Sequence, residues 1–296
     1  KRDLVDYLDA VADRLVPLLA GRALSVIRVR PGQAPFMQKN LPDYAPASIR
    51  TLDVATQDGK RVVHYPVCED RETLLWFANQ RAVEYHPTLF RELAFDTPTH
   101  LVVDIDPPAG ADAFARAVEA ALLVRQVLGD AGTAALAKTS GAKGVHVVVP
   151  LAPGRSSSDV AAGTRAVAAR AERLDPTLTT TAFVVEERGG KVFLDSTRAG
   201  GATLVAAYSP RVRVGVPVSL PVAWDELADV SPADFTIATV PRLLGDTDPW
   251  TELMPPPQEL DDGLVDEGHT IPVARVAAMH AGKRRARERR AAEQEP

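Results

Sequence analysis

The sequence predicts an α+β fold in which helices flank a mixed β-sheet. Two short apolar runs rich in β-branched residues, 101–106 and 145–149, have the length and the bounding residues of strands. Two longer stretches, 111–129 and 159–173, are amphipathic and long enough for helices. Their order along the chain is βαβ followed by αββ, which is typical of a ferredoxin-like or RNA-recognition-like sheet.

The part of the chain before residue 101 is expected to form helices and strands of its own. Apolar residues recur there at helical spacing in two stretches, and three others alternate as strands do. The expected elements are helices at 3–19 and 71–83, a strand at 24–30, and a hairpin of 49–55 with 61–67 joined through Asp58-Gly59.

Three further strands are expected after the helix at 111–129. One lies near 133–138, ahead of the strand at 145–149. The other two, 182–187 and 191–195, are expected to form a hairpin through Gly189-Gly190. A helix is expected at 159–173, because a run of serines and an aspartate, which are favoured N-cap residues, stands at its start.

Composition limits the classes of protein that the chain can belong to. Its 296 residues, 46% hydrophobic and 25% charged, suffice for one large domain or two intimate modules. A single cysteine, Cys68, excludes an intramolecular disulfide and a thiolate-rich zinc site. No apolar run of about 18 residues and no signal peptide is visible, so we expect a cytoplasmic protein without a membrane partner.

Two aspartates, Asp104 and Asp106, stand at the end of the run at 101–106. Side chains alternate across a strand, so both carboxylates point to the same face. Two close like charges repel, and a divalent cation such as Mg²⁺ or Mn²⁺ relieves that repulsion. Taken alone, the pair is better explained as two solvated carboxylates at the end of a strand.

A glycine-punctuated turn, 139–144, leads into the strand at 145–149. It carries Ser140 and Lys143, and His146 follows it. Each of these side chains can donate a hydrogen bond to a phosphate oxygen, and glycines let the backbone approach an anion. The spacing is not that of a Walker A loop, and a strand follows rather than a helix. The alternative is an ordinary hairpin with a surface lysine.

A third carboxylate, Asp195, ends the short apolar run 191–195. On a strand next to the Asp104–Asp106 pair it would complete a site for two metal ions, as used in phosphoryl transfer. Alone, an aspartate at the end of a strand is more often a turn residue. The three motifs in this order make the phosphoryl-transfer interpretation the stronger one.

The three motifs together resemble those of the archaeo-eukaryotic primase superfamily. The resemblance is greatest to the bacterial primase-polymerases of the ligase D polymerase-domain family, which act in end joining and gap repair. It extends from Lys1 to about Leu244. Further matching segments are Gln33–Lys39, Glu84–His86, Ala207–Arg213, Val218–Pro221 and Trp224–Leu227.

The resemblance implies a primase-like catalytic core and a role for each matching residue. Three aspartates would be both the catalytic residues and the ligands of two Mn²⁺ or Mg²⁺ ions: Asp104, Asp106 and Asp195. Five residues would bind the nucleoside triphosphate: Ser140, Lys143, His146, Arg211 and His86.

Four residues would contact DNA at gaps or double-strand-break ends. Lys1 and Lys39 match lysines associated with the template strand and a 5′-phosphate. Phe36 and Met37 match a pair that is usually two aromatics that stack on bases, so Met37 is a departure. A second departure is the segment 195–201, which lacks an aromatic and one residue. Ku and a DNA ligase are further implied partners, in a bacterial cytoplasm and at the nucleoid.

The leading prediction is a template-dependent primase-polymerase in DNA repair that prefers ribonucleotides. The alternatives are a two-metal nuclease or phosphatase and a catalytically silent module that binds nucleic acid or Ku. The catalytic domain is expected at 1–250, and 251–296 as a Pro-rich linker and a basic C-terminal helix or tail. The basic run 283–290, in a helix expected at 272–292, indicates nucleic acid or simply a solvated helix end.

Overall fold

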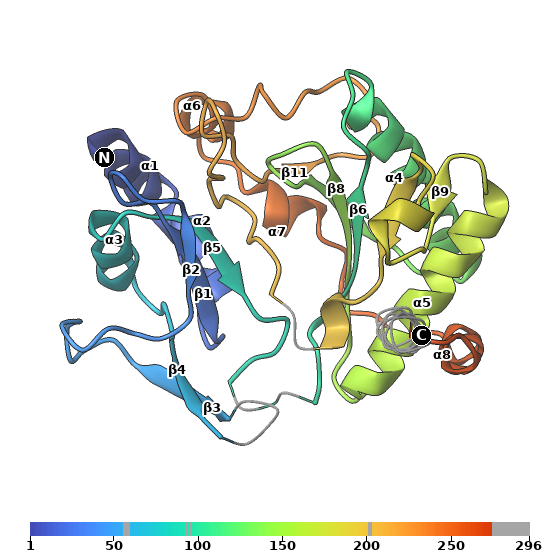
Figure 1. Ribbon diagram of the computed structural model, residues 1–296, viewed down its shortest axis with the longest axis horizontal. Helices are drawn as coiled ribbons and strands as arrows, with labels where there is room; N and C mark the ends of the chain where they lie inside the picture. The colour runs from blue at the N-terminus through green and yellow to red at the C-terminus, as the bar shows by residue number, and fades with distance from the viewer. Residues whose placement is uncertain (56–59, 93, 95, 201–202, 274–296) are drawn as a thin grey trace, which may run out of the picture.

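A mixed sheet of six strands organises the second half of the chain (Figure 1). The computed structural model describes residues 1–273 apart from 56–59, 93, 95, 201 and 202. The strand order is β11-β7-β8-β6-β10-β9, and only the β10–β9 pair is parallel. The strands are β6 (His100–Asp106), β7 (Leu136–Thr139), β8 (Val145–Pro150), β9 (Thr179–Thr180), β10 (Val192–Asp195) and β11 (Pro221–Val222).

Two long helices, α4 (Ala113–Asp130) and α5 (Ser157–Leu174), pack on one face of this sheet (Figure 1). The odd-numbered residues of β6, such as Leu101 and Val103, join α4 and α5 in the core. Reading β6-α4-β7-β8-α5-β10 gives the βαββαβ order of a ferredoxin-like unit, with β8 and β6 as its central strands. The predicted α+β class and sheet type are therefore confirmed.

The opposite face of the sheet carries the even-numbered residues of β6. At one end of this face Val102 packs with Val148 and with Leu89 and Leu204 from other segments. At the other end the alternation presents Asp104 and Asp106. One face of one sheet therefore holds an apolar patch and an acidic patch side by side.

The first half of the chain contributes a smaller sheet and three helices, which lie to the left of the larger sheet in Figure 1. The order β2-β1-β5 is antiparallel throughout, and a separate hairpin pairs β3 with β4. The elements are α1 (Arg2–Ala10), α2 (Ala12–Leu19), β1 (Leu24–Arg28), β2 (Phe36–Gln38), β3 (Thr51–Ala55), β4 (Val62–Pro66), α3 (Arg71–Asn79) and β5 (Ala82–Pro87).

Two expected helices differ from those observed. The helix expected over 3–19 is divided at Val11 into α1 and α2. The helix expected over 71–83 ends at Asn79, because Arg81 takes a left-handed φ of 62°. The chain then continues as β5, a strand that was not predicted from the sequence.

The expected hairpin of 182–187 with 191–195 is wrong. Residues 192–195 do form β10, but 182–187 contains only a 3₁₀ turn, η1 (Val185–Glu187). The Asp175 carboxylate accepts from the backbone N–H groups of Thr177 and Leu178. That turn directs β9 alongside β10, so the place of the expected partner is taken.

The segment after residue 239 returns to the core through three short helices, α6 (Val240–Leu244), α7 (Pro249–Leu253) and α8 (Asp262–Thr270). α8 crosses α5 so closely that a Cβ at Gly268 would lie 1.8 Å from the Ala162 carbonyl oxygen. Most of the helix expected over 272–292, including its basic run, lies outside the described residues. No helix within the described part of the chain is both long and apolar enough to span a membrane.

Candidate active site

Four functional side chains stand in a row across adjacent strands of the large sheet. Lys138 on β7 is paired with His146 on β8, His146 with Asp104 on β6, and Asp104 with Asp195 on β10. Asp106 lies two residues further along β6 on the same face. The register of the sheet thus brings the three predicted carboxylates together beside the predicted histidine.

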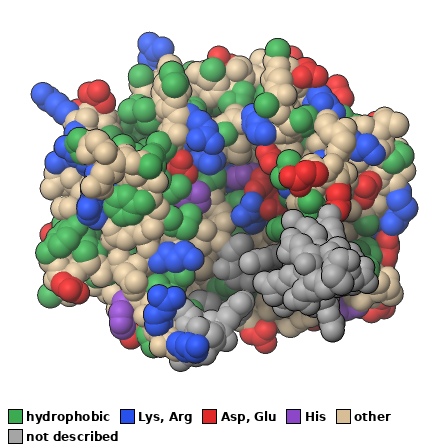
Figure 2. All heavy atoms as spheres, in the orientation of Figure 1, with side chains coloured by type: hydrophobic (Ala, Val, Ile, Leu, Met, Phe, Trp, Pro, Cys, Tyr) green, Lys and Arg blue, Asp and Glu red, His purple; other side chains and the backbone are tan. Residues whose placement is uncertain are grey.

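A cavity of about 380 Å³ opens over this row. It unites seven of the predicted site residues: Asp104, Asp106, Asp195, Ser140, Lys143, His146 and Arg211. Two arginines that were not predicted as site residues, Arg188 and Arg198, also line it. Figure 2 shows basic side chains on both sides of a hollow in the middle of this face, with acidic and histidine side chains within it.

Asp104 faces a basic partner on each side. Its Oδ1 lies 3.3 Å from His146 Nε2, and its Oδ2 accepts from Arg198 at 2.6 Å. Burial opposes ionisation of Asp104, but His146 and Arg198 outweigh it and hold the pKa of this carboxyl below its usual range. Asp104 is therefore ionised at neutral pH.

Asp195 shares the same guanidinium. Its Oδ2 lies 3.0 Å from Arg198, which stands at the start of the 3₁₀ turn η2 (Arg198–Gly200). Its Oδ1 accepts from the backbone N–H of Thr197 at 2.9 Å and from the Thr197 hydroxyl at 2.6 Å. Arg198 lies within the segment whose sequence departs from the family pattern, and that departure was the only signal that could have indicated it.

Asp106 projects furthest toward solvent, with 47% of its side chain exposed. Lys143 lies 3.2 Å from its Oδ1 and also donates to the Pro107 carbonyl. Arg188 lies 3.5 Å from its Oδ2 and is stacked 3.8 Å above the Phe193 ring. Two cations from two different loops therefore face one exposed carboxylate.

The turn at 140–144 is built around the Ser140 hydroxyl. Ser140 Oγ accepts from the backbone N–H groups of Ala142 and Gly144, at 3.2 and 3.1 Å. The turn also passes very close to β6, since a Cβ at Gly144 would lie 2.3 Å from the Ile105 carbonyl oxygen. Ser140 therefore shapes the loop that presents Lys143, and only glycine fits at position 144.

Arg211 connects this loop to the smaller sheet. Its guanidinium donates to the Ser140 carbonyl, and its Nε lies 3.1 Å from Glu84 Oε2 on β5. Glu84 also contacts His86 Nε2 at 2.8 Å and accepts from the Val212 N–H. Burial raises the pKa of Glu84, but these partners lower it more, to about 2. His86 is thus linked to the cavity through Glu84 and Arg211 and does not line it.

The residues predicted to contact DNA lie on the smaller sheet and its surroundings, apart from the carboxylate cavity. Phe36 on β2 has the Arg30 guanidinium 5.1 Å from its ring centroid, and 47% of the neighbouring Met37 is exposed. Lys39 is exposed just after β2. Lys1 lines a second cavity, of about 730 Å³, which Arg211 also lines.

The chemistry of the carboxylates suits a divalent cation. Hard ions prefer carboxylate oxygens, and three such groups from adjacent strands share one cavity. Across the described residues, however, no group of three or more His, Cys, Asp and Glu side chains is gathered closely enough to hold a metal ion as it stands. Each carboxylate faces Arg198, Arg188, Lys143 or His146 instead.

Comparison with known proteins finds the same family along most of the chain. The family model for the LigD primase-polymerase domain matches residues 1–250. The bifunctional non-homologous end joining protein LigD of Bacillus subtilis (strain 168) is 36% identical over 245 residues, which are 81% of this chain and 39% of that protein. The multifunctional non-homologous end joining DNA repair protein LigD of Mycobacterium tuberculosis (strain ATCC 25618 / H37Rv) is 35% identical, over 77% of this chain and 31% of that protein.

A solved structure agrees with these relatives. The polymerase domain from Mycobacterium tuberculosis ligase D, in complex with DNA, matches with a TM-score of 0.76 and 33% identity. The match covers 85% of this chain and 91% of that domain. The chain spans about a third of the length of the curated relatives, so the similarity concerns their polymerase portion. This chain belongs to the LigD primase-polymerase domain family, whose members are nucleotidyltransferase-type polymerases.

Proposed function

We propose that the protein is a template-dependent primase-polymerase that adds nucleotides to primer 3′ ends at DNA gaps or breaks during repair. The observation that carries this proposal is the cavity in which three carboxylates meet the glycine-containing loop at 140–144, which presents Lys143. A nuclease or phosphatase would need the carboxylates but not a loop for a triphosphate. A silent binding module would need neither, since it gains nothing from holding three acids together.

Asp104, Asp106 and Asp195 would hold two divalent ions, Mn²⁺ or Mg²⁺. Bound ions would neutralise charge on the transferring phosphate and acidify the primer 3′-hydroxyl. The register of β6 and β10 supports this assignment because it places all three carboxylates on one face of the sheet. The cations now facing the carboxylates are the groups that a divalent ion and a triphosphate would rearrange.

The nucleotide would lie with its triphosphate against the loop at 140–144. Lys143, Arg211 and His146 face the cavity with N–H groups, which are the donors that phosphate oxygens require. Ser140 would act mainly through the shape of the loop, since its hydroxyl already accepts two backbone hydrogen bonds. His86 would act through Glu84, and we propose that the sugar pocket accepts ribonucleotides in preference to deoxyribonucleotides.

DNA would bind across the smaller sheet and the mouth of the cavity. The relative with a solved structure is in complex with DNA. The net charge of this chain is −5, so attraction must come from a local patch. Lys1 and Lys39 would bind the template strand and a 5′-phosphate, and Phe36 with Met37 would contact unpaired bases. Ku and a DNA ligase would be its partners at broken ends, in the bacterial cytoplasm at the nucleoid.

The carboxylates provide the direct test of this chemistry. Asp104→Asn, Asp106→Asn and Asp195→Asn should each lower the rate of primer extension by about 100-fold or more, because the stabilisation of the transferring phosphate is lost. DNA affinity should stay within about twofold, since DNA is assigned to other residues. Asp130→Asn, at the exposed end of α4, is the matched control. Undiminished extension by Asp195→Asn would remove β10 from the site.

The sugar preference is tested separately. With wild-type protein, kcat/KM on a gapped template should be higher for each ribonucleoside triphosphate than for its deoxyribonucleoside counterpart. The ratio should be measured in Mn²⁺ and again in Mg²⁺, because the two ions tolerate geometry differently. Exclusive use of deoxyribonucleotides with both ions would contradict the preference while leaving the polymerase assignment intact.

A further inference from the structure

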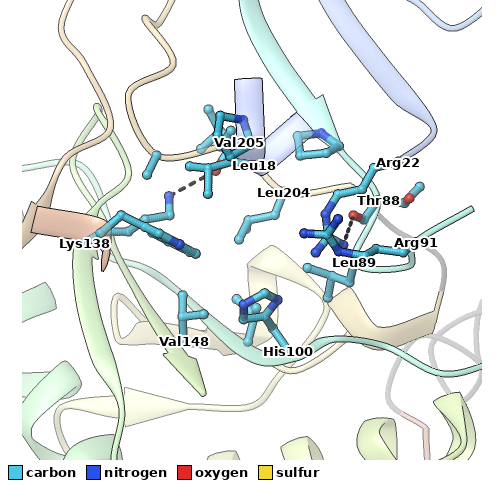
Figure 3. Close-up of a pocket in the computed structure, with 16 residues that line it drawn as sticks. Leu18, Arg22, Thr88, Leu89, Arg91, His100, Lys138, Val148, Leu204 and Val205 are labelled. Atoms are coloured by element: carbon cyan, nitrogen blue, oxygen red, sulfur yellow. Dashed lines mark hydrogen bonds between the residues drawn. The ribbon is translucent and has the colours of Figure 1, made fainter. Parts of the chain in front are cut away.

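Lys138 is a lysine with 1% of its surface exposed, at the centre of the large sheet. It stands at the inner end of the four-strand row, next to His146. An apolar cavity of about 210 Å³ lies on its other side. Figure 3 shows Lys138 at one wall of that cavity, opposite Arg22, with its ammonium group turned to the Val205 carbonyl. A buried lysine with no acidic partner among the described ion pairs requires a specific reason.

The surroundings of the amino group supply three acceptors. Lys138 Nζ lies 3.0 Å from the Val205 carbonyl oxygen, 2.7 Å from Ser219 Oγ and 2.7 Å from His146 Nδ1. Ser219 Oγ donates its own proton to the Thr139 carbonyl at 2.6 Å, so it accepts from the lysine. Burial lowers the pKa of Lys138, but the three partners around Nζ favour the ammonium form, which has three N–H donors and no acceptor.

The contact of the other ring nitrogen, Nε2, indicates which atom donates in the hydrogen bond between Lys138 Nζ and His146 Nδ1. His146 Nε2 faces Asp104 Oδ1 at 3.3 Å, and an ionised carboxylate only accepts, so Nε2 carries a proton. Lys138 Nζ lies 2.7 Å from Nδ1, and an ammonium group can only donate in that contact. Nδ1 therefore offers its lone pair to Lys138.

We propose that Lys138 is a positioning residue for nucleotidyl transfer, which fixes the ring of His146 and its Nε2–H tautomer by donating to Nδ1. The Nε2–H is thereby aimed at the carboxylates and at the triphosphate that the loop would hold. This inference rests on the proposed function, since that function assigns His146 to the nucleotide. It adds a residue that does not line the carboxylate cavity and would touch neither nucleotide nor metal.

The sheet explains why position 138 needs a long side chain that donates a hydrogen bond. The residue opposite His146 on β7 must span one strand spacing and still reach Nδ1, and it must be a donor. An apolar side chain there would leave Nδ1 as a buried acceptor without a donor, a condition that proteins avoid. The ring would then be free to rotate or to exchange tautomers.

Nuclear magnetic resonance of ¹⁵N-histidine-labelled full-length protein tests the tautomer without substrate. The resonances of His146 are assigned by their loss in His146→Gln. The wild-type ring should show a protonated Nε2 and an unprotonated Nδ1 whose shift reports an accepted hydrogen bond. In Lys138→Met the Nδ1 shift should move to that of a free ring nitrogen. A wild-type ring protonated at Nδ1, or a shift that Lys138→Met leaves unchanged, overturns the proposal.

Nucleotide kinetics test the consequence. Lys138→Met should raise the KM or Kd for a nucleoside triphosphate about tenfold, the worth of one well-placed hydrogen bond to a charged group. Leu136→Met is the matched control, because Leu136 is buried on the same face of β7 and packs with Val148 rather than His146. An unchanged nucleotide affinity in Lys138→Met would overturn the positioning role.

The two measurements separate the two proposals. If the wild type adds no nucleotides but the His146 shifts behave as expected, the proposed function fails and the contact of Lys138 stands. If the wild type extends primers but His146 is protonated at Nδ1, the proposed function stands and the inference fails. Should Lys138→Met not fold, the wild-type tautomer alone still decides.

Discussion

At the residue scale, the site consists of three aspartates whose carboxylates form ion pairs with basic side chains from other segments. Arg198 bridges Asp104 and Asp195, at 2.6 and 3.0 Å, while Lys143 and Arg188 face Asp106. These pairs make it possible to fold three acids into one cavity. They also mean that a bound divalent ion would compete with a guanidinium for the same oxygens.

Replacing Arg198 should expose that competition. Arg198→Gln should bind Mn²⁺ about tenfold more tightly in the absence of nucleotide, because a cation next to two of the proposed ligands is removed. Titration of Mn²⁺ followed by electron paramagnetic resonance measures this affinity. Arg173→Gln, which breaks a surface pair with Glu267, is the control. Equal or weaker binding by Arg198→Gln would argue against competition.

Glu84 makes the free energy of unfolding depend on pH. Its pKa is about 2 in the folded protein, below the ordinary value of 4.5, so its contribution to stability is complete above about pH 4.5 and is lost as the pH falls toward 2. The shift corresponds to about 3 kcal/mol, which solvent screening lowers to about 1–2 kcal/mol. The free energy of unfolding of wild type relative to Glu84→Gln should shrink by that amount between pH 5 and pH 2. A difference that is constant with pH would refute the assignment.

The sequence predicted the acids of the site but not their partners. Asp104 and Asp106 could be placed on one face because alternation along a strand is a local rule. Lys138 and Arg198 could not be found in this way. Their contacts depend on which strands become neighbours and on how a loop returns to the sheet, and these are properties of the tertiary fold.

At the element scale, the central βαββαβ unit was predictable because its strands and helices are long and strongly patterned. The errors lie where elements are short. The residues of β9 carry no periodic signal, so the neighbour of β10 was misassigned to 182–187. The boundary between α3 and β5 was missed because it depends on the left-handed conformation of one arginine, Arg81.

The loop at 140–144 should tolerate no side chain at Gly144. Gly144→Ala would press a Cβ onto the Ile105 carbonyl, so we expect a loss of about 1–3 kcal/mol in the free energy of unfolding. The nucleotide KM should also rise, because Lys143 and His146 flank the displaced residue. Gly129→Ala, in open space on α4, should be neutral or stabilise slightly. Chemical denaturation and nucleotide titration of both variants measure these effects, and wild-type values for Gly144→Ala would contradict the close approach.

At the scale of the whole molecule, the residues proposed for catalysis and those proposed for DNA binding lie in different parts of the fold. The larger sheet carries the carboxylates, and the residues assigned to DNA lie on the smaller sheet or close to it in the first half of the chain. Arg211 and Glu84 connect the two, since they join the loop at 140–144 to β5. With a net charge of −5, the proposed binding of DNA would depend on local basic residues.

Lys39 should therefore be measurable as a single phosphate contact. Lys39→Ala should weaken binding to a gap with a 5′-phosphate and lower the salt dependence of binding by about one unit of slope. Binding to the same gap with a 5′-hydroxyl should change much less. The control is Arg125→Gln. Arg125 lies on α4, which covers the face of the larger sheet opposite the carboxylates. If Lys39→Ala keeps the wild-type preference for the phosphate, another residue recognises it.

The central claim is templated nucleotidyl transfer by the carboxylate cavity, and one measurement tests it most directly. Wild-type protein is incubated with Mn²⁺ and a primer annealed to a gapped template, in four versions that differ only in the templating base, with one nucleotide at a time. The account predicts addition of the complementary nucleotide in each version and loss of that addition in Asp104→Asn. Addition that ignores the templating base, shortening of the primer, or no reaction would contradict it.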